Sequence, residues 1–362
     1  MPESPVRQLK FGEALREATD ICMARDSRVI VMGEGVPDPK AIFKTTEGLR
    51  EKYGPARVFD TPLSENGMTG VCIGAAVTGM RPILVHQRID FALLSMDQLV
   101  NNAAKWHYMF GGVSSVPMVI RMIIGRGWGQ GPQHSQGLQA MFAQVPGLKV
   151  VMPTSPHDAK GMLIAAVEDD NPVVFIEHRW LHNVSGDVPG GVYTVPIGLS
   201  RKMHSGADLT IVAFSYMALE SLKAAQALLM HVGVGIDLID MRSLRPLDSK
   251  AVMDSIAKTG RLLVADPAFK TGSFATEIMS IAMEEGFHLL KMAPKRVTLP
   301  DHPVPTSHLL SNGYYPGPMQ IAQTALQMLG HVLTVIERQA LDAALQPRTP
   351  HDVPDISFQG PF

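Results

Sequence analysis

The side chains of Glu65 and His134 can transfer protons, and the stretches around these two residues give the clearest indication of a functional site. Glu65 lies in the stretch RVFDTPLSENGMTGVCIGAA (57–76), between a β-like run and a helical segment of small residues. An acid in the first turn of a helix meets the partly positive end of the helix dipole, and Ser64 can cap that helix. The same carboxyl group can also serve as a general acid or base. Both roles stay open at this point.

His134 follows a glycine-rich stretch, GRGWGQGP (125–132), that comes directly after a strand-like run. The glycine spacing is G-x-G-x-G-x-G, and Pro132 stands where a nucleotide-binding helix would begin. The stretch is therefore not a dinucleotide fingerprint. We interpret it as a flexible loop that brings the His134 imidazole to a ligand.

Other catalytic and metal-binding motifs are missing or incomplete. The sequence has neither a G-x-x-x-x-G-K-[ST] loop nor a G-x-S-x-G elbow, which argues against a P-loop nucleotidase and a serine hydrolase. HRWLH (178–182) places two histidines four residues apart, but it lacks the H-E-x-x-H pattern and a third ligand. We therefore predict that His178 and His182 are surface or linker residues.

The composition is that of a folded globular protein. The 362 residues are enough for two domains, and 46% of them are hydrophobic and 18% charged. A formal net charge of −2 gives no positive field that would attract nucleic acid. Cys22 and Cys72 lie in apolar helical contexts, which argues against a disulfide framework or a metal knuckle. Without a signal, transit or membrane-spanning pattern, we expect a reduced, soluble, cytoplasmic protein with no membrane partner.

Strand-like and helix-like segments alternate along the chain, which is typical of parallel α/β architecture. We expect two doubly wound α/β domains. The first covers residues 1–185, with strands at 28–34, 81–87, 116–124, 148–153 and 171–178, and helices at 11–24, 67–79, 95–109 and after the cap residue Ser155. The second covers 207–330, with strands at 207–215, 234–241, 261–266 and 295–300, and helices at 217–231, 248–258, 273–285 and 317–330. A Gly- and Pro-rich linker (186–206) joins them, and a helix at 331–344 with a Pro-rich tail completes residues 331–362.

The helix after Glu65 contains several small residues, including Gly70, Gly74 and Gly79. Each glycine costs a helix about 1 kcal/mol relative to alanine, so a close approach of another helix or backbone must offset that cost. Packing inside the domain and a subunit interface beside Glu65 explain the pattern equally well.

The sequence resembles the beta subunits of thiamine-diphosphate-dependent 2-oxo acid dehydrogenases of the pyruvate and branched-chain types, within the transketolase-like superfamily. The resemblance covers about residues 6–330 and is carried above all by the elements DTPLSE and QHSQ. Further matching stretches are DFALLSMDQLVNNAAKWHYMFGG (90–112), PGLKVVMPTSPHDAKGMLIAAVEDDNPVVFIEH (146–178) and DLIDMRSLRPLD (237–248). The resemblance implies a pyrimidine-binding domain for thiamine diphosphate, followed by a transketolase C-terminal domain.

The resemblance also implies roles for five residues. Glu65 takes the place of the glutamate that hydrogen-bonds N1′ of the aminopyrimidine, and thereby stabilises the imino tautomer that accepts the C2 proton of the thiazolium. That role requires Glu65 to be largely shielded from water. Phe91 matches the aromatic residue that stacks on the pyrimidine ring, and Leu63 and Gln87 flank that ring. His134 matches the active-site histidine of the substrate channel.

A structural site for a monovalent cation such as K⁺ is implied as well. Hard cations prefer oxygen ligands. The matching groups are three main-chain carbonyls and two polar residues: Met118, Ala166, Val167, Asp169 and Asn171. A helix C-terminus followed by a turn at EDDNP (168–172) explains the same residues without a cation.

The half of the cofactor site that holds the diphosphate is missing from this sequence. Members of the superfamily bind the diphosphate through Mg²⁺ with a G-D-G motif followed by N-N. G-D-G does not occur here, and N-N occurs only at 101–102, inside a predicted helix. The resemblance therefore implies an alpha-type partner chain that carries this motif and holds Mg²⁺, in an α₂β₂ heterotetramer.

Two enzymatic functions are compatible with these features. The first is the beta subunit of the decarboxylating component of a 2-oxo acid dehydrogenase, which passes the acyl group to lipoamide on an acyltransferase. The alternative is half of a split transketolase-like carboligase, which passes an activated aldehyde to a sugar or another acceptor. Departures from the family pattern at VHQRIDF (85–91), DPAFKTGSFATEI (266–278) and LPDHPVPTSHLLSNGYYP (299–316) leave substrate and acceptor open. The presence of both Glu65 and His134 argues against a purely structural subunit.

Overall fold

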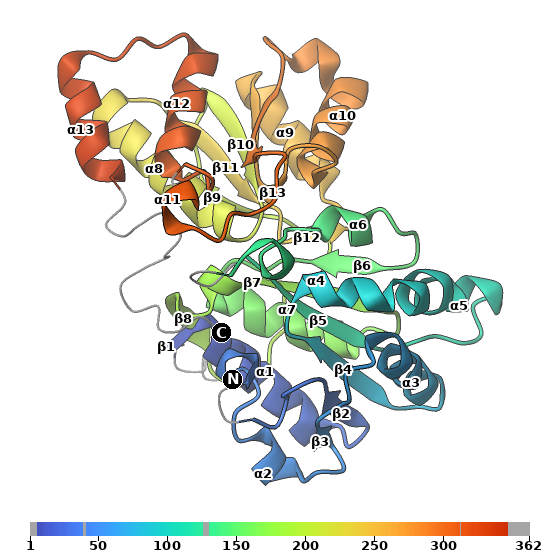
Figure 1. The fold of residues 1–362 in the computed structure, drawn as a ribbon. Coiled ribbons are helices and arrows are strands. Elements are labelled where there is room, and N and C mark those ends of the chain that lie inside the picture. The colour runs from blue at the N-terminus through green and yellow to red at the C-terminus, as the bar shows by residue number, and fades with distance from the viewer. Residues whose placement is uncertain (1–5, 39–40, 126–129, 312, 347–362) are drawn as a thin grey trace.

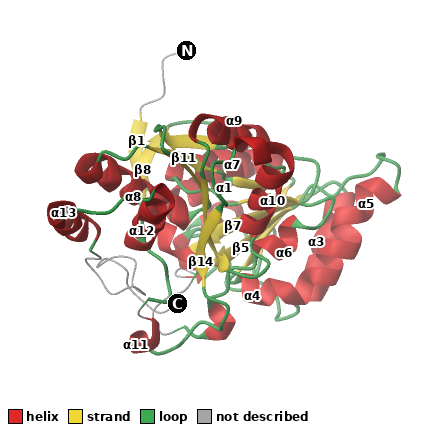
Figure 2. Ribbon diagram, turned by 90° about the horizontal axis from the view of Figure 1, so that it is seen from above, coloured by secondary structure: helices red, strands yellow, loops and turns green. Residues whose placement is uncertain are grey.

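The computed structural model describes residues 6–38, 41–125, 130–311 and 313–346. Two α/β units are stacked, the N-terminal one coloured blue to green and the C-terminal one yellow to red (Figure 1). Seen from above, helices α3, α4 and α5 gather on one side of the molecule and α8, α12 and α13 on the other (Figure 2). The prediction of two parallel-sheet α/β domains is confirmed.

The N-terminal unit is built on a sheet with the strand order β12-β6-β7-β5-β4-β2-β3. Six of its strands are parallel: β2 (Val29–Met32), β3 (Val58–Phe59), β4 (Arg81–His86), β5 (Val119–Ile124), β6 (Lys149–Val151) and β7 (Val173–His178). All residues of β2, β5 and β7 are buried. Strands of this kind need helices on both faces of the sheet, which explains their continuous apolar runs.

Helices cover both faces of this sheet. On one face α1 (Phe11–Arg25) packs against α7 (Pro156–Glu168), and both contribute side chains to a common apolar cluster with β2 and β4. On the other face α3 (Glu65–Val77) contributes to a second cluster. Shorter helices complete the unit: α2 (Leu49–Tyr53), α4 (Ile89–Ala92), α5 (Ala104–Met109) and α6 (Gln139–Ala143).

The C-terminal unit is built on a sheet with the order β14-β13-β10-β11-β9. β10 (Leu209–Ala213), β11 (Ile236–Asp240), β13 (Leu262–Phe269) and β14 (Lys295–Leu299) are parallel, and β9 (Arg201–His204) is an antiparallel edge strand. Its helices are α8 (Tyr216–Val232), α9 (Ser249–Thr259), α10 (Phe274–Gly286), α11 (His308–Ser311), α12 (Pro318–Leu329) and α13 (Val335–Leu345). Strand pairing joins the two units: β12 (Ser243–Arg245) comes from the later part of the chain and pairs with β6 at the edge of the first sheet.

Several local predictions have clear outcomes. The Ser155 hydroxyl accepts a hydrogen bond from the Asp158 amide and caps α7, as predicted. Ser64 occupies the N-cap position of α3, but within the described residues its side chain makes no capping hydrogen bond, so that prediction is wrong. The predicted linker is also not free of structure, because β8 (Ser185–Pro189) pairs with β1 (Val6–Lys10) and β9 pairs with β11. The Pro-rich tail lies outside the described residues from position 347 onward.

Both cysteines are buried thiols without a disulfide, as predicted. Over the described ranges, no helix has the length and apolar character needed to cross a bilayer. The same ranges contain no group of three or more His, Cys, Asp or Glu side chains that could hold a metal ion.

Candidate active site

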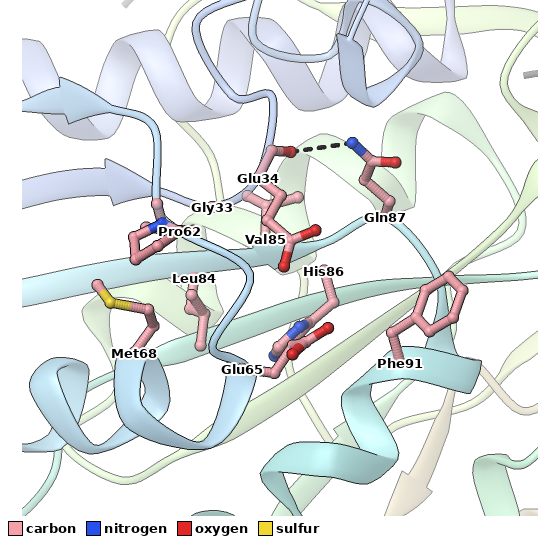
Figure 3. Close-up of a pocket in the computed structure, with 11 residues that line it drawn as sticks. Gly33, Glu34, Pro62, Glu65, Met68, Leu84, Val85, His86, Gln87 and Phe91 are labelled. Carbon is pink, nitrogen blue, oxygen red and sulfur yellow. Dashed lines mark hydrogen bonds between the residues drawn. The ribbon is translucent and has the colours of Figure 1, made fainter.

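A pocket lies where the chain leaves the carboxyl ends of β2 and β4, the edge at which open parallel sheets bind ligands. Figure 3 shows its lining, to which β4, α3 and α4 all contribute. The residues that line it are Gly33, Glu34, Thr61, Pro62, Glu65, Met68, Leu84, Val85, His86, Gln87 and Phe91. The wall is mixed: the side chains of Glu34, Thr61, Glu65, His86 and Gln87 are polar, and the other lining residues are apolar or glycine.

Glu65 is the first residue of α3, and its backbone is fixed from two sides. The hydroxyl groups of Thr69 and Ser95 donate hydrogen bonds to the Glu65 carbonyl oxygen at 2.7 and 3.1 Å. The side chain is only partly buried in this single chain, so the shielding from water that was expected is incomplete. A second carboxyl group, that of Glu34, lines the same pocket. Burial and the nearby negative charge of Glu65 raise the pKa of Glu34.

Phe91 and His134 meet at the edge of this pocket. Phe91 comes from α4, and His134 ends a short 3₁₀ turn (Pro132–His134). Their ring centroids lie 5.2 Å apart with planes at 79°, an edge-to-face contact. Because Phe91 also lines the pocket with Glu65, the fold brings together three of the residues that the sequence predicts. His134 is exposed, and Phe91 is 37% exposed.

Gln87 and Leu63 differ in their relation to the pocket. Gln87 lines it, but its side-chain amide donates to the Glu34 carbonyl oxygen at 3.1 Å (Figure 3). Leu63 is not among the lining residues and is 82% exposed. Leu63 is therefore next to the pocket in sequence, while its side chain faces solvent.

His86 is a pocket residue that the sequence analysis missed. It ends β4, is 7% exposed, and its Nε2 atom is buried without a hydrogen-bond partner among the described residues. Burial lowers the pKa of this imidazole to about 4, so it is neutral at physiological pH. Figure 3 places it in the same pocket as Glu65. The one sequence feature that could have indicated His86 as a site residue is the unusual polarity of VHQRIDF (85–91).

The pocket fits a flat aromatic ring with a polar edge. Met68, Leu84 and Phe91 supply apolar surface, Glu65 supplies a carboxyl group, and His86 stands beside them with an Nε2 atom that has no partner among the described residues. Buried polar atoms of folded proteins nearly always have partners, so the orphaned His86 nitrogen itself points to a ligand.

Comparison with known proteins agrees with this arrangement. Residues 7–203 match the family model for the transketolase pyrimidine binding domain, and residues 198–321 match that for the transketolase C-terminal domain. The beta subunit of acetoin:2,6-dichlorophenolindophenol oxidoreductase from Bacillus subtilis is 39% identical, covering 90% of this chain and 98% of that protein. The 2-oxoisovalerate dehydrogenase beta subunit of Pseudomonas aeruginosa is 40% identical, over 87% and 93%. The pyruvate dehydrogenase E1 beta subunit of Rickettsia felis is also 40% identical, over 82% and 91%.

The chain belongs to the family of 2-oxo acid dehydrogenase beta subunits. A solved structure described as a split gene transketolase, inactive beta4 tetramer, has the same fold with a TM-score of 0.72 at 19% identity, and covers 89% of this chain and 98% of that one. The resemblance predicted from the sequence is confirmed, and thiamine diphosphate is the coenzyme of this family. The individual roles of Glu65, Leu63, Gln87, Phe91 and His134 stay predictions.

Protein donors contact part of the cation site that the resemblance implies. The carbonyl oxygens of Val167 and Asp169 accept hydrogen bonds from the Arg81 guanidinium at 2.9 and 3.0 Å. The Lys149 ammonium pairs with the Asp169 carboxylate. The remaining predicted ligands lie in the same region: Met118, Ala166 and Asn171. The Met118 carbonyl accepts from a backbone amide at 3.0 Å. A guanidinium and an ammonium thus bind the oxygens of Val167 and Asp169, and the cation site stays a prediction.

His178 and His182 of this beta subunit are not surface residues, which corrects the prediction. They are 5% and 4% exposed. His178 is the last residue of β7 and its ring stacks on Tyr216 of α8 at 5.1 Å, and His182 follows the short turn after β7. The Nε2 atom of His182 lies 3.0 Å from the carboxylate of Glu177, which also pairs with the buried Arg121 at 2.6 Å. His182, Glu177 and Arg121 therefore form a buried polar network. The four-residue spacing of His178 and His182 in the sequence could not indicate this network.

Proposed function

We propose that this beta subunit supplies the pyrimidine half of a thiamine diphosphate site and acts in the oxidative decarboxylation of a 2-oxo acid. One observation carries the proposal: Glu65, Phe91 and His86 line a single pocket at the carboxyl ends of β2 and β4. When bound, the coenzyme supplies the carbon centre that allows a 2-oxo acid to lose CO₂. The remaining tasks belong to the protein.

The side chains of the pocket divide these tasks among them. Glu65 holds a proton in a hydrogen bond to N1′ of the pyrimidine, and Phe91 offers its face to that ring. Met68 and Leu84 keep water away from the polar edge of the pocket, which strengthens the hydrogen bonds made inside it. The exposed imidazole of His134, at the edge of Phe91, is placed to exchange a proton with the substrate.

An alpha-type subunit that carries the G-D-G and N-N motif and holds Mg²⁺ completes the site, in an α₂β₂ assembly. Exposed large side chains support this: Leu63 (82%) and Leu94 (61%) stand close in sequence to Glu65 and Phe91, and Tyr108 (88%), Met109 (58%) and Val113 (89%) lie at and after the end of α5. Large exposed apolar areas of this kind mark protein interfaces. Nothing in the described chain lies within 4 Å of a side chain built at Gly74, so the small-residue helix has an open face there.

The acceptor is tested by reconstitution. The chain is mixed with its alpha-type subunit, thiamine diphosphate and Mg²⁺, and offered pyruvate or a branched 2-oxo acid with a lipoyl domain or an aldose. We expect the reconstituted complex to acylate the lipoyl domain and to form no ketose. Accumulation of ketose without lipoyl acylation contradicts the proposal. Tight coenzyme binding and turnover by the isolated chain contradict the need for a partner.

A further inference from the structure

Arg88 is a buried charge that the catalytic scheme above does not use. It stands at the N-cap of α4, three residues before Phe91, and is 3% exposed. Burial lowers the pKa of its guanidinium to about 10, so the group is still charged at neutral pH. Arg88 belongs to the same polar stretch, 85–91, as His86.

The guanidinium of Arg88 holds both ends of the glycine-rich stretch that leads to His134. Its Nη1 atom donates to the Gly125 carbonyl oxygen at 2.6 Å, and its Nη2 atom donates to Oε1 of Gln130. Both acceptors are neutral. Burial of a charge costs free energy that neutral acceptors offset only in part, so an ion pair would serve stability better. The benefit of burying Arg88 is therefore that its two hydrogen bonds hold Gly125 and Gln130 in place.

The segment that follows Gln130 is tied to the same helix. The Ser135 hydroxyl donates to the carbonyl oxygens of Gln130 and Gly131 at 3.0 and 2.9 Å, which closes a tight turn around His134. On the far side of that turn, the Asp90 carboxylate accepts from the Gln136 side chain at 2.8 Å. Residues 88, 90 and 91 thus contact the chain before, after and at His134.

We propose that Arg88 is a positioning residue, which keeps the His134 imidazole at the edge of Phe91 by fixing the two ends of the glycine-rich stretch. His134 is exposed and sits in a three-residue turn, so its position depends on the contact with Phe91 and on the contacts that hold the turn. Without Arg88, the Gly125 carbonyl oxygen and the Gln130 side chain lose the donors that tie them to the start of α4. The catalytic part of this proposal rests on the proposed function, in which His134 exchanges a proton with the substrate.

The structural part is tested on the isolated chain by hydrogen exchange. Arg88→Met removes both donors, Arg88→Lys keeps a charge with fewer donors, and Arg50→Met on the exposed helix α2 is the matched control. We expect exchange in the peptide around 130–138 to rise by about tenfold or more in Arg88→Met, less in Arg88→Lys, and not in the control. Unchanged exchange in Arg88→Met overturns the proposal.

A second variant covers the case in which Arg88→Met does not fold. Gln130→Leu removes one acceptor and leaves the buried arginine in place. We expect exchange around 130–138 to rise in the same direction, by less than in Arg88→Met. An exchange pattern equal to that of the unmodified chain overturns the proposal.

The catalytic part is tested in the reconstituted complex. We expect Arg88→Met to lower kcat by about 10- to 100-fold with little change in KM, and Arg88→Lys to recover part of the loss. In a His134→Ala background, Arg88→Met has no further effect if it acts through His134. An equal loss of kcat in both backgrounds overturns the proposal. If His134→Ala itself keeps full activity, the proposed role of His134 fails, and the exchange data still decide whether Arg88 holds the turn.

Discussion

The two ends of strand β4 contrast sharply in how their polar groups are satisfied. At the amino end, the Arg81 guanidinium donates to the carbonyl oxygens of Val167 and Asp169 and pairs with the Asp170 carboxylate at 2.5 Å. At the carboxyl end, His86 is buried with an Nε2 atom that has no partner in the described chain. Only four residues of the same strand lie between Arg81, whose polar contacts are complete, and His86, whose Nε2 atom has no partner among the described residues.

Within β4, the amino end therefore contributes to stability and the carboxyl end to binding. Arg81 joins β4 to the end of α7 and the following turn, so its contacts strengthen the fold. His86 weakens the fold by an unsatisfied buried nitrogen, which is a feature that folded proteins retain chiefly at functional sites. Changes at the carboxyl end should therefore alter activity or pH dependence, and changes at the amino end should alter stability alone.

The largest effect is expected from Glu65→Gln. The amide is isosteric with the carboxyl group but cannot exchange a proton with the coenzyme, so kcat of the reconstituted complex should fall by about 10²- to 10⁴-fold. The measurement is 2-oxo acid decarboxylation at saturating substrate and coenzyme, with assembly followed by size-exclusion chromatography.

Glu51→Gln on the exposed helix α2 is the control, because it makes the same chemical change away from the pocket. It should keep its activity and its assembly. Full turnover of the Glu65→Gln complex would remove Glu65 from the chemistry and reduce it to a helix-terminal charge.

A smaller effect is expected from His86→Leu, and it depends on pH. The pKa of His86 is about 4 in the folded chain, below its ordinary value of 6.5, so the unfolded state binds more protons between these pH values. Acidification through this range therefore destabilises the unmodified chain, by about 3 kcal/mol at pH 4 from this residue alone. Above pH 6.5 the contribution of this titration vanishes.

Urea denaturation at several pH values tests this expectation. The stability of His86→Leu should fall less steeply below pH 6.5 than that of the unmodified chain. His288→Leu, which removes an exposed histidine, should follow the unmodified chain. Parallel curves for His86→Leu and the unmodified chain would mean that His86 finds a partner or solvent that the pocket does not show.

The fold was largely predictable because its strands and helices are local, strongly patterned segments. The apolar runs of β5 and β7 and the capped start of α7 lie where the sequence predicts them. The pairing of β1 with β8, and of β12 with the first sheet, was not predictable. These pairs join distant segments whose Gly, Pro and polar residues give no alternating pattern.

Residues of the site were predictable only where they stand in a sequence motif of the family. Glu65, Phe91 and His134 stand in stretches that resemble the family, and the fold brings them together. His86 and Arg88 follow no such motif. Their burial depends on the loops that close over the end of β4, which no periodicity within β4 can reveal.

The smallest effect is expected at the amino end of β4, from Arg81→Met. The substitution leaves two carbonyl oxygens without their donor, and it should lower the free energy of unfolding by about 1–3 kcal/mol. Activity per folded complex should be unchanged, and Arg50→Met, the same substitution at an exposed arginine, should have little effect on stability. Because Arg81 and Lys149 supply the positive charge at this end, the unmodified chain should melt at the same temperature in KCl and in NaCl of equal ionic strength. A higher melting temperature in KCl alone would show that the Val167 and Asp169 oxygens bind K⁺ despite these donors, and the contrast between the two ends of β4 would then be wrong.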